Sequence, residues 1–146
     1  MISDVLSSDS VQLGLPSVER DRAIRAAGEA LVDAGHADEA YVETMFLREE
    51  MVSTYLGNGI AIPHGTSEGA DHVRSTGIVV LQFPDGVDWG AGTAHLVVGI
   101  AARDDSHIGI LSALAEVLED EAECQRLFVA DSVDDVVATL SGTEAA

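Results

Sequence analysis

Lysine is absent from the 146 residues, and every basic residue of the chain is an arginine. The 26 Asp and Glu residues outnumber seven arginines, so the formal net charge is -19 and the pI is near 4.2. Such a chain repels nucleic acid phosphates and anionic lipid, which argues against both as partners. Because the screening length falls to about 3 Å in 1 M salt, we predict a halophile's protein. The alternative is an acidic protein of a mesophile.

Cysteine, aromatic residues and long apolar runs are also scarce. Cys124 is the single cysteine, so an intramolecular disulfide or a cysteine-based metal site is excluded. The aromatic share of 4% predicts an aliphatic core. No apolar run has the length of a membrane span, and the first ten residues lack a basic leader and an apolar segment. We therefore expect a cytoplasmic protein that is not exported and does not insert into a membrane.

What is present predicts one domain of alternating strands and helices. Apolar runs at 77–83 and 94–101 are typical of buried strands, with Pro84–Gly86 as a turn after the first. Shorter strands are expected at 11–13 and 60–62. Apolar residues recur at helical spacing after the candidate caps Ser17, Asp105 or Ser106, and Ser132, and also from about Asp38 and over 121–129. The prediction is an α/β fold: a single three-layer domain over 11–141 with a mixed β-sheet flanked by helices. Residues 1–10 and 142–146 are expected to be flexible.

The stretch from Gly57 to Thr66 places one histidine at a strand end. Pro63 lacks the N–H that a strand ladder needs, so the predicted strand stops and His64 emerges after it. Gly65 permits a close approach of backbone or ligand, and Thr66 adds a hydroxyl. Neutral imidazole can act as a nucleophile, which makes His64 the candidate reactive residue. The same pattern also fits a plain turn.

Two further residues fit the chemistry of a phosphoryl group. His107 falls in the first turn of a predicted helix, where backbone amides and the helix dipole favour an anion. Arg48 falls near the end of another helix and could pair with phosphoryl oxygens or with an acidic partner residue. Its plainer role is to complement the helix dipole at that end.

Three blocks of the sequence resemble one known family. They are REEMVSTYLGNGIAIPHGT, HVRSTGIVVLQFPDGVDWG and LVVGIAARDDSHIGIL, and the likeness extends from about Ser10 to Ser141. The chain resembles the enzyme IIA domain of the mannitol/fructose class of the bacterial phosphoenolpyruvate-dependent sugar phosphotransferase system. The resemblance implies a cytosolic phosphotransferase component with a phosphohistidine intermediate and with neither a metal nor an organic cofactor.

The resemblance also implies roles and partners. His64 matches the phosphorylated histidine, His107 matches its helper, and Arg48 matches the arginine that opens the first block. Asn58 stands where some mannitol-type members carry a glutamate beside the site, and asparagine is familiar in fructose-type members, which favours fructose. The donor would be HPr and the acceptor a cysteine of a IIB domain that serves a membrane permease. A free-standing subunit is expected, docked through an apolar patch around His64.

Other interpretations remain open at this point. A nitrogen-branch-like regulatory IIA protein would be phosphorylated but would act by binding other proteins. A hydrolase would use His64 and His107 as bases, although no serine nucleophile elbow is present. A metal site from His64, His95 and His107 lacks the usual histidine spacing. His36 and His72 are interpreted as surface residues and His95 as a core or edge residue.

Overall fold

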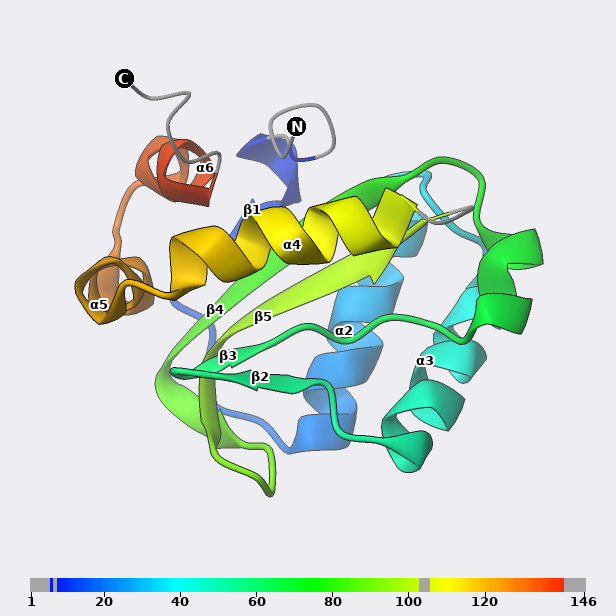
Figure 1. Cartoon of the computed structure of the whole chain (residues 1–146), viewed down its shortest axis with the longest axis horizontal. Coiled ribbons are helices and arrows are strands. Elements are labelled where there is room, and N and C mark those ends of the chain that lie inside the picture. The colour runs from blue at the N-terminus through cyan, green and yellow to red at the C-terminus, as the bar shows by residue number, and fades with distance from the viewer. Residues whose placement is uncertain (1–5, 7, 103–105, 141–146) are drawn as a thin grey trace.

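The fold is built on a mixed five-stranded sheet. The computed structural model describes residues 6, 8–102 and 106–140, with the backbone alone for 8, 67, 70, 106–108 and 117. The strand order is β1-β4-β5-β3-β2 (Figure 1). The strands are β1 Val11–Gln12, β2 Tyr55–Gly57, β3 Ile60–Ala61, β4 Gly77–Asp88 and β5 Thr93–Ala101. Since β4 and β5 are antiparallel whereas β3 and β5 are parallel, the predicted mixed sheet is confirmed.

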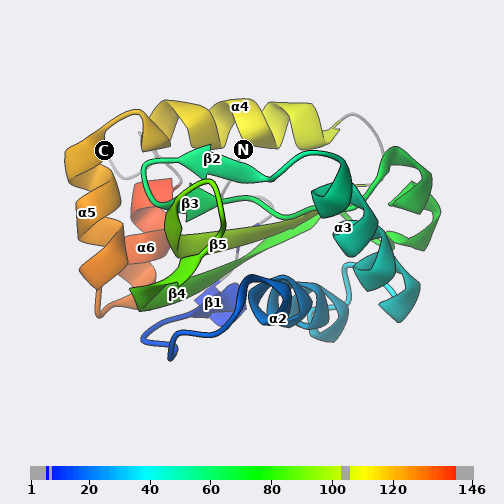
Figure 2. The same cartoon turned by 90° about the horizontal axis from the view of Figure 1, so that it is seen from below.

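Helices cover both faces of this sheet (Figure 2). On one face lie α2 (Arg20–Asp33) and α3 (Glu39–Met51), and on the other α4 (Ser106–Leu118), α5 (Glu121–Val129) and α6 (Val133–Leu140). The side chains of β4 alternate between the two layers, with Ile78 and Val80 packed toward α4 and Val79 and Leu81 toward α2. The predicted three-layer α/β architecture is therefore confirmed.

The end of β4 differs from the prediction. Pro84–Gly86 does not end the strand, because Val87 and Asp88 still pair with β5. The register shifts between Gln82 and Val87, so extra residues of β4 bulge outward. Pro84 is exposed within this bulge, where its missing N–H costs no ladder bond. Val87 and Asp88 thus belong to β4, beyond the expected turn.

The predicted start of α2 was also wrong. Glu19 is its N-cap residue and makes no side-chain cap bond. The Ser17 hydroxyl instead donates to the Gly86 carbonyl (2.5 Å) and ties the preceding segment to the β4 bulge. The predicted cap Ser132 is confirmed, because its hydroxyl accepts from the Asp135 N–H. The helix expected from about Asp38 begins at Glu39, and Asp38 is its N-cap, accepting from the Ala40 N–H.

The packed region begins before Val11. Leu6 is buried in the core, and Ser8–Ser10 form a short 3-10 helix, η1. The remaining parts of the expected flexible ends, residues 1–5, 7 and 142–146, lie outside the described residues, as does Asp105. No helix within the described ranges combines the length and the apolar character that crossing a membrane requires.

Candidate functional site

His64 lies just beyond β3, alongside the end of β5. It pairs with Ile100 in an isolated parallel bridge, and the Ile100 N–H donates to the Pro63 carbonyl (3.0 Å). The imidazole is half-buried, and its Nδ1 is 2.8 Å from the Ile62 carbonyl oxygen. A carbonyl can only accept, so in the neutral ring Nδ1 carries the proton and Nε2 carries the lone pair.

Gly65 and Thr66 pack the loop after His64 onto α3. A Cβ at Gly65 would collide with Thr44 Oγ1 and lie 2.6 Å from Tyr41 Cε1, so this position has no room for a side chain. The Thr66 hydroxyl accepts from the Gly69 N–H (3.2 Å) and begins the 3-10 helix η2, Ser67–His72. The hydroxyl of Thr66 thus has a structural role next to the histidine.

Arg48 lies on the face of α3 that adjoins this loop. Thr44, one helical turn earlier, would meet a Cβ at either Gly65 or Gly69, and residues four apart share a helix face. The Arg48 guanidinium donates to the Val52 carbonyl (2.6 Å) at the end of α3. The arginine therefore satisfies a helix-terminal carbonyl, as the plainer sequence interpretation expected.

The start of α4 is placed at the same edge of the sheet as His64. β3 and β5 are parallel, so their carboxyl ends coincide, and α4 begins five residues after Ala101, near the tip of β5 (Figure 1). His107 is the second residue of α4. Its side chain lies outside the described part of the structure, so its expected place beside His64 stays a prediction.

Asn58 lies at the opposite end of β3. Its side-chain Nδ2 donates to the carbonyl of Leu118, the last residue of α4 (3.1 Å). Twelve residue steps at 1.5 Å separate that end of the helix from Ser106, about 18 Å. Asn58 has φ 52° and Gly59 φ 82°, as in the tight Asn-Gly turn of a hairpin. The structure thus does not bring Asn58 together with His64.

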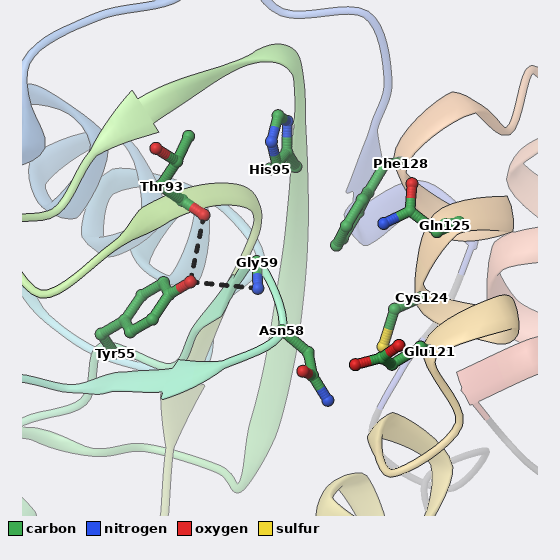
Figure 3. Close-up of a pocket in the computed structure, with 9 residues that line it drawn as sticks. All are labelled: Tyr55, Asn58, Gly59, Thr93, His95, Glu121, Cys124, Gln125 and Phe128. Carbon is green, nitrogen blue, oxygen red and sulfur yellow. Dashed lines mark hydrogen bonds between the residues drawn. The ribbon is translucent and has the colours of Figure 1, made fainter.

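A pocket of about 370 Å³ opens at this far end (Figure 3). Most of its lining residues have polar side chains, and Phe128 adds an apolar ring. The lining consists of Tyr55, Asn58, Gly59, Thr93, His95, Glu121, Cys124, Gln125 and Phe128. The Tyr55 hydroxyl is held by two backbone groups, and His95 Nδ1 donates to the Pro84 carbonyl (3.1 Å). Glu121 is the charged residue of this lining. A pocket with a carboxylate and without Arg or Lys does not suit a phosphoryl group.

Two buried residues of α3 that the sequence analysis did not single out bind other parts of the fold. The hydroxyl of Tyr41 contacts the backbone beside His64, and burial raises the pKa of this phenol. Glu49 is a buried carboxylate that accepts from the Thr54 N–H (2.9 Å), the Thr54 hydroxyl (2.5 Å) and Trp89 Nε1 (3.1 Å). The spacing that placed both residues on a helix could not reveal these distant partners.

His36 and His72 have hydrogen-bonding partners of their own. His72 is a surface residue 3.4 Å from Asp38, as expected. His36 is also partly exposed, but its ring packs against Gly77, its Nδ1 lies 2.9 Å from the Ser75 hydroxyl, and burial lowers its pKa. Among the described residues, no group of three or more His, Cys, Asp or Glu side chains is arranged to hold a metal ion.

Comparison with known proteins places this arrangement in one family. A model of the family "Phosphoenolpyruvate-dependent sugar phosphotransferase system, EIIA 2" matches residues 4–142. A mannitol-specific phosphotransferase enzyme IIA component of Staphylococcus aureus (strain MRSA252) is 40% identical, over 92% of this chain and 94% of its own. A multiphosphoryl transfer protein of Escherichia coli O157:H7 is 44% identical over 94% of this chain. The chain spans 22% to 37% of the length of that protein and other long relatives.

A solved structure agrees with the sequence comparison. The enzyme IIA of the mannitol system of Escherichia coli, determined in complex with phosphorylated enzyme IIB, superposes with a TM-score of 0.88. It is 41% identical, and the match covers 94% of this chain and 97% of that one.

Proposed function

Because this chain belongs to the phosphoenolpyruvate-dependent sugar phosphotransferase system EIIA 2 family, we propose that it is a cytoplasmic phosphoryl carrier that uses His64. The observation that carries the proposal is the hydrogen bond between His64 Nδ1 and the Ile62 carbonyl (2.8 Å). This bond leaves the lone pair on Nε2, which makes Nε2 the nucleophile.

The transfer needs few bond changes at this ring. The Nε2 lone pair attacks the phosphorus of a phosphohistidine donor, the donor's N–P bond breaks, and its electron pair returns to the donor ring. The phosphorylated ring of His64 becomes positively charged while Nδ1 keeps its proton. The Ile62 carbonyl accepts from that Nδ1–H throughout, so it stabilises the developing charge. Attack by a partner cysteine thiolate then breaks the new N–P bond and restores neutral His64.

Charge on the phosphoryl oxygens requires donors from neighbouring elements. We propose His107, at the start of α4, as one such donor. The topology supports this role, because α4 begins at the same end of the sheet as His64. Arg48 is the second, reached by releasing the Val52 carbonyl that it now contacts. Gly65 lets the loop lie close to α3, and Thr66 holds its turn.

The proposed donor is HPr and the proposed acceptor is a IIB domain. The solved complex of a related IIA with phosphorylated IIB supports the acceptor. Exposed apolar side chains gather where α3 ends and β2 follows, on either side of Arg48: Leu47, Met51, Val52 and Leu56. At a net charge of -19, burial of this patch is a better source of partner affinity than long-range attraction. Partner binding that weakens steeply with salt would contradict this docking mode.

The sugar that the system transports is proposed from the relatives. The Staphylococcus aureus enzyme IIA component and the Escherichia coli enzyme IIA of the solved complex belong to mannitol systems, which supports mannitol. The earlier preference for fructose depended on Asn58, and this residue binds the far end of α4 rather than the loop of His64. We therefore propose mannitol first and keep fructose as the alternative to be tested.

Phosphorylation in a reconstituted system tests the proposal. The protein is mixed with phosphoenolpyruvate, enzyme I and HPr, and a IIB domain with its permease and either mannitol or fructose is added later. We expect an acid-labile, base-stable phosphate that is absent from His64→Ala and present in His72→Ala, and that is lost when one sugar is added. No label on the wild type would refute the carrier role. A label that no sugar removes would favour the regulatory alternative.

A further inference from the structure

The hydroxyl of Tyr41 lies between the two chain segments that meet at His64. It donates to the Ile100 carbonyl (2.7 Å) and accepts from the Gly65 N–H (2.9 Å). Ile100 is the bridge partner of His64, and Gly65 is the next residue after it. One oxygen from α3 therefore joins the end of β5 to the peptide that follows the histidine.

This contact completes the fixation of the backbone at His64. On the preceding side, the Pro63 carbonyl accepts from the Ile100 N–H (3.0 Å). On the following side, the Gly65 N–H is held by Tyr41. Without the hydroxyl, the Gly65 N–H would lose the partner that ties the loop after His64 to α3.

The phenol ring is built into the site. Tyr41 is 3% exposed, and the lack of a Cβ at Gly65 lets the loop lie against the ring. Desolvation raises the pKa of the phenol, so the hydroxyl stays protonated and continues to donate to Ile100 near neutral pH.

We infer that Tyr41 is a positioning residue for phosphoryl transfer, whose hydroxyl holds the His64 peptide where Nε2 meets the donor phosphorus. The inference rests on the proposed function. Tyr41 touches no reacting atom and acts through the backbone of His64. A displacement of about 1 Å at a reacting atom costs about 100-fold in rate, so we expect the loss of the hydroxyl in Tyr41→Phe to slow transfer by about 10-fold or more.

The other tyrosine of the chain supplies a matched control. The Tyr55 hydroxyl likewise donates to a backbone carbonyl, of Thr93 (3.3 Å), and accepts from a backbone N–H, of Gly59 (3.1 Å). These partners lie at the opposite end of β3 (Figure 3). Tyr55→Phe therefore removes the same two kinds of bond, one of them again to β5, but away from His64.

The experiment compares single-turnover phosphorylation of the wild type and both variants at saturating phospho-HPr. We expect Tyr41→Phe to lower the maximal rate with little change in the donor concentration for half-saturation, and Tyr55→Phe to react like the wild type. ¹⁵N NMR of the imidazole should show the His64 proton less confined to Nδ1 in Tyr41→Phe. A normal rate in Tyr41→Phe, or equal slowing in both variants, would overturn the inference. An unlabelled wild type would instead refute the proposed function.

A second variant covers the case in which Tyr41→Phe does not fold. Difluorotyrosine introduced into a Tyr55→Phe background labels residue 41 alone and keeps the ring and hydroxyl in place. Its hydroxyl ionises at lower pH than tyrosine and then no longer donates to Ile100. The transfer rate should fall as this hydroxyl ionises, relative to unlabelled Tyr55→Phe at each pH. A rate that does not follow the ionisation would contradict the role of Tyr41.

Discussion

At the scale of single residues, contacts with α3 hold the loop that follows His64. Gly65 makes the closest approach to this helix, because Thr44 and Tyr41 occupy the space that a side chain at residue 65 would need. The loop can reach α3 only if residue 65 has no Cβ. This requirement gives the glycine a steric role next to the proposed phosphorylation site.

Gly65→Ala should therefore damage both stability and phosphorylation. The added methyl would displace the loop or Tyr41, and overpacking of this kind costs about 1 to 3 kcal/mol. Thermal unfolding followed by circular dichroism should show a lower midpoint, and phospho-HPr should label the variant more slowly. Gly35→Ala is the control. Its backbone has a positive φ, so alanine is strained there, but the added methyl meets no atom within 4 Å. Equal labelling of the two alanine variants would contradict the steric role.

His36 should make stability sensitive to acid. Burial lowers its pKa below the ordinary 6.5, so the folded protein binds this proton less readily than the unfolded chain. The stabilising difference is fully present above pH 6.5 and decreases as the pH falls through 6.5 toward the folded pKa. Urea unfolding between pH 7.5 and about 5.5 should show a shallower loss of stability in His36→Gln than in the wild type. Equal slopes in the wild type and in His36→Gln would contradict this role of His36.

Single residues also show what sequence patterns can and cannot predict. The glycines and Pro63 around His64 indicated a strand end from local chemistry, and the structure places it there. The hydrogen-bond partners of Tyr41 are 24 and 59 residues away along the chain, and those of Glu49 are 5 and 40 residues away. Helical spacing indicates only which face a side chain occupies, so these contacts required coordinates. The expected role of His107 beside His64 stays a prediction.

At the scale of elements, Glu49 joins α3 to β2 and to the end of β4. Its carboxylate binds the residue before β2, Thr54, and the residue after β4, Trp89. Hydrophobic patterning predicted the two long strands because their apolar runs are continuous. It ended β4 too early, because a proline was interpreted as a turn while the bulge that accommodates it depends on pairing with β5.

Glu49→Gln should loosen this junction. An amide keeps one acceptor oxygen but directs N–H groups at donors, and hydrogen bonds to charged groups contribute about 1.5 to 3 kcal/mol. For a domain of this size the melting temperature should fall by several degrees. Glu50→Gln changes the same charge at the adjacent exposed position and should leave the midpoint near the wild-type value. Indistinguishable midpoints would show that the buried carboxylate contributes little.

At the scale of the whole molecule, the dominant quantity is the net charge of -19. The described ion pairs involve exposed side chains, as at Arg20–Asp21 and Arg126–Glu123. Exposed ion pairs contribute little to the free energy of unfolding. Repulsion among the carboxylates therefore opposes folding unless salt screens it. The proposal of a halophilic origin depends on this balance.

Potassium chloride should stabilise the protein strongly. Raising the salt from about 0.1 M to 1 M shortens the screening length from about 10 Å to about 3 Å, so the melting temperature should rise over this range. Sucrose at equal osmolality controls for effects of excluded cosolute. A melting temperature that rises equally in both solutions would show that charge screening is not responsible.

Trp89 gives this molecule a built-in optical signal. It is the chain's only tryptophan and is 1% exposed. Its indole N–H donates to the carboxylate of Glu49, near the C-terminal end of α3. Fluorescence emission from this single indole should shift to longer wavelength whenever water enters between α3 and the sheet. Movement of that helix during the phosphorylation cycle can therefore be followed in real time without attaching a dye.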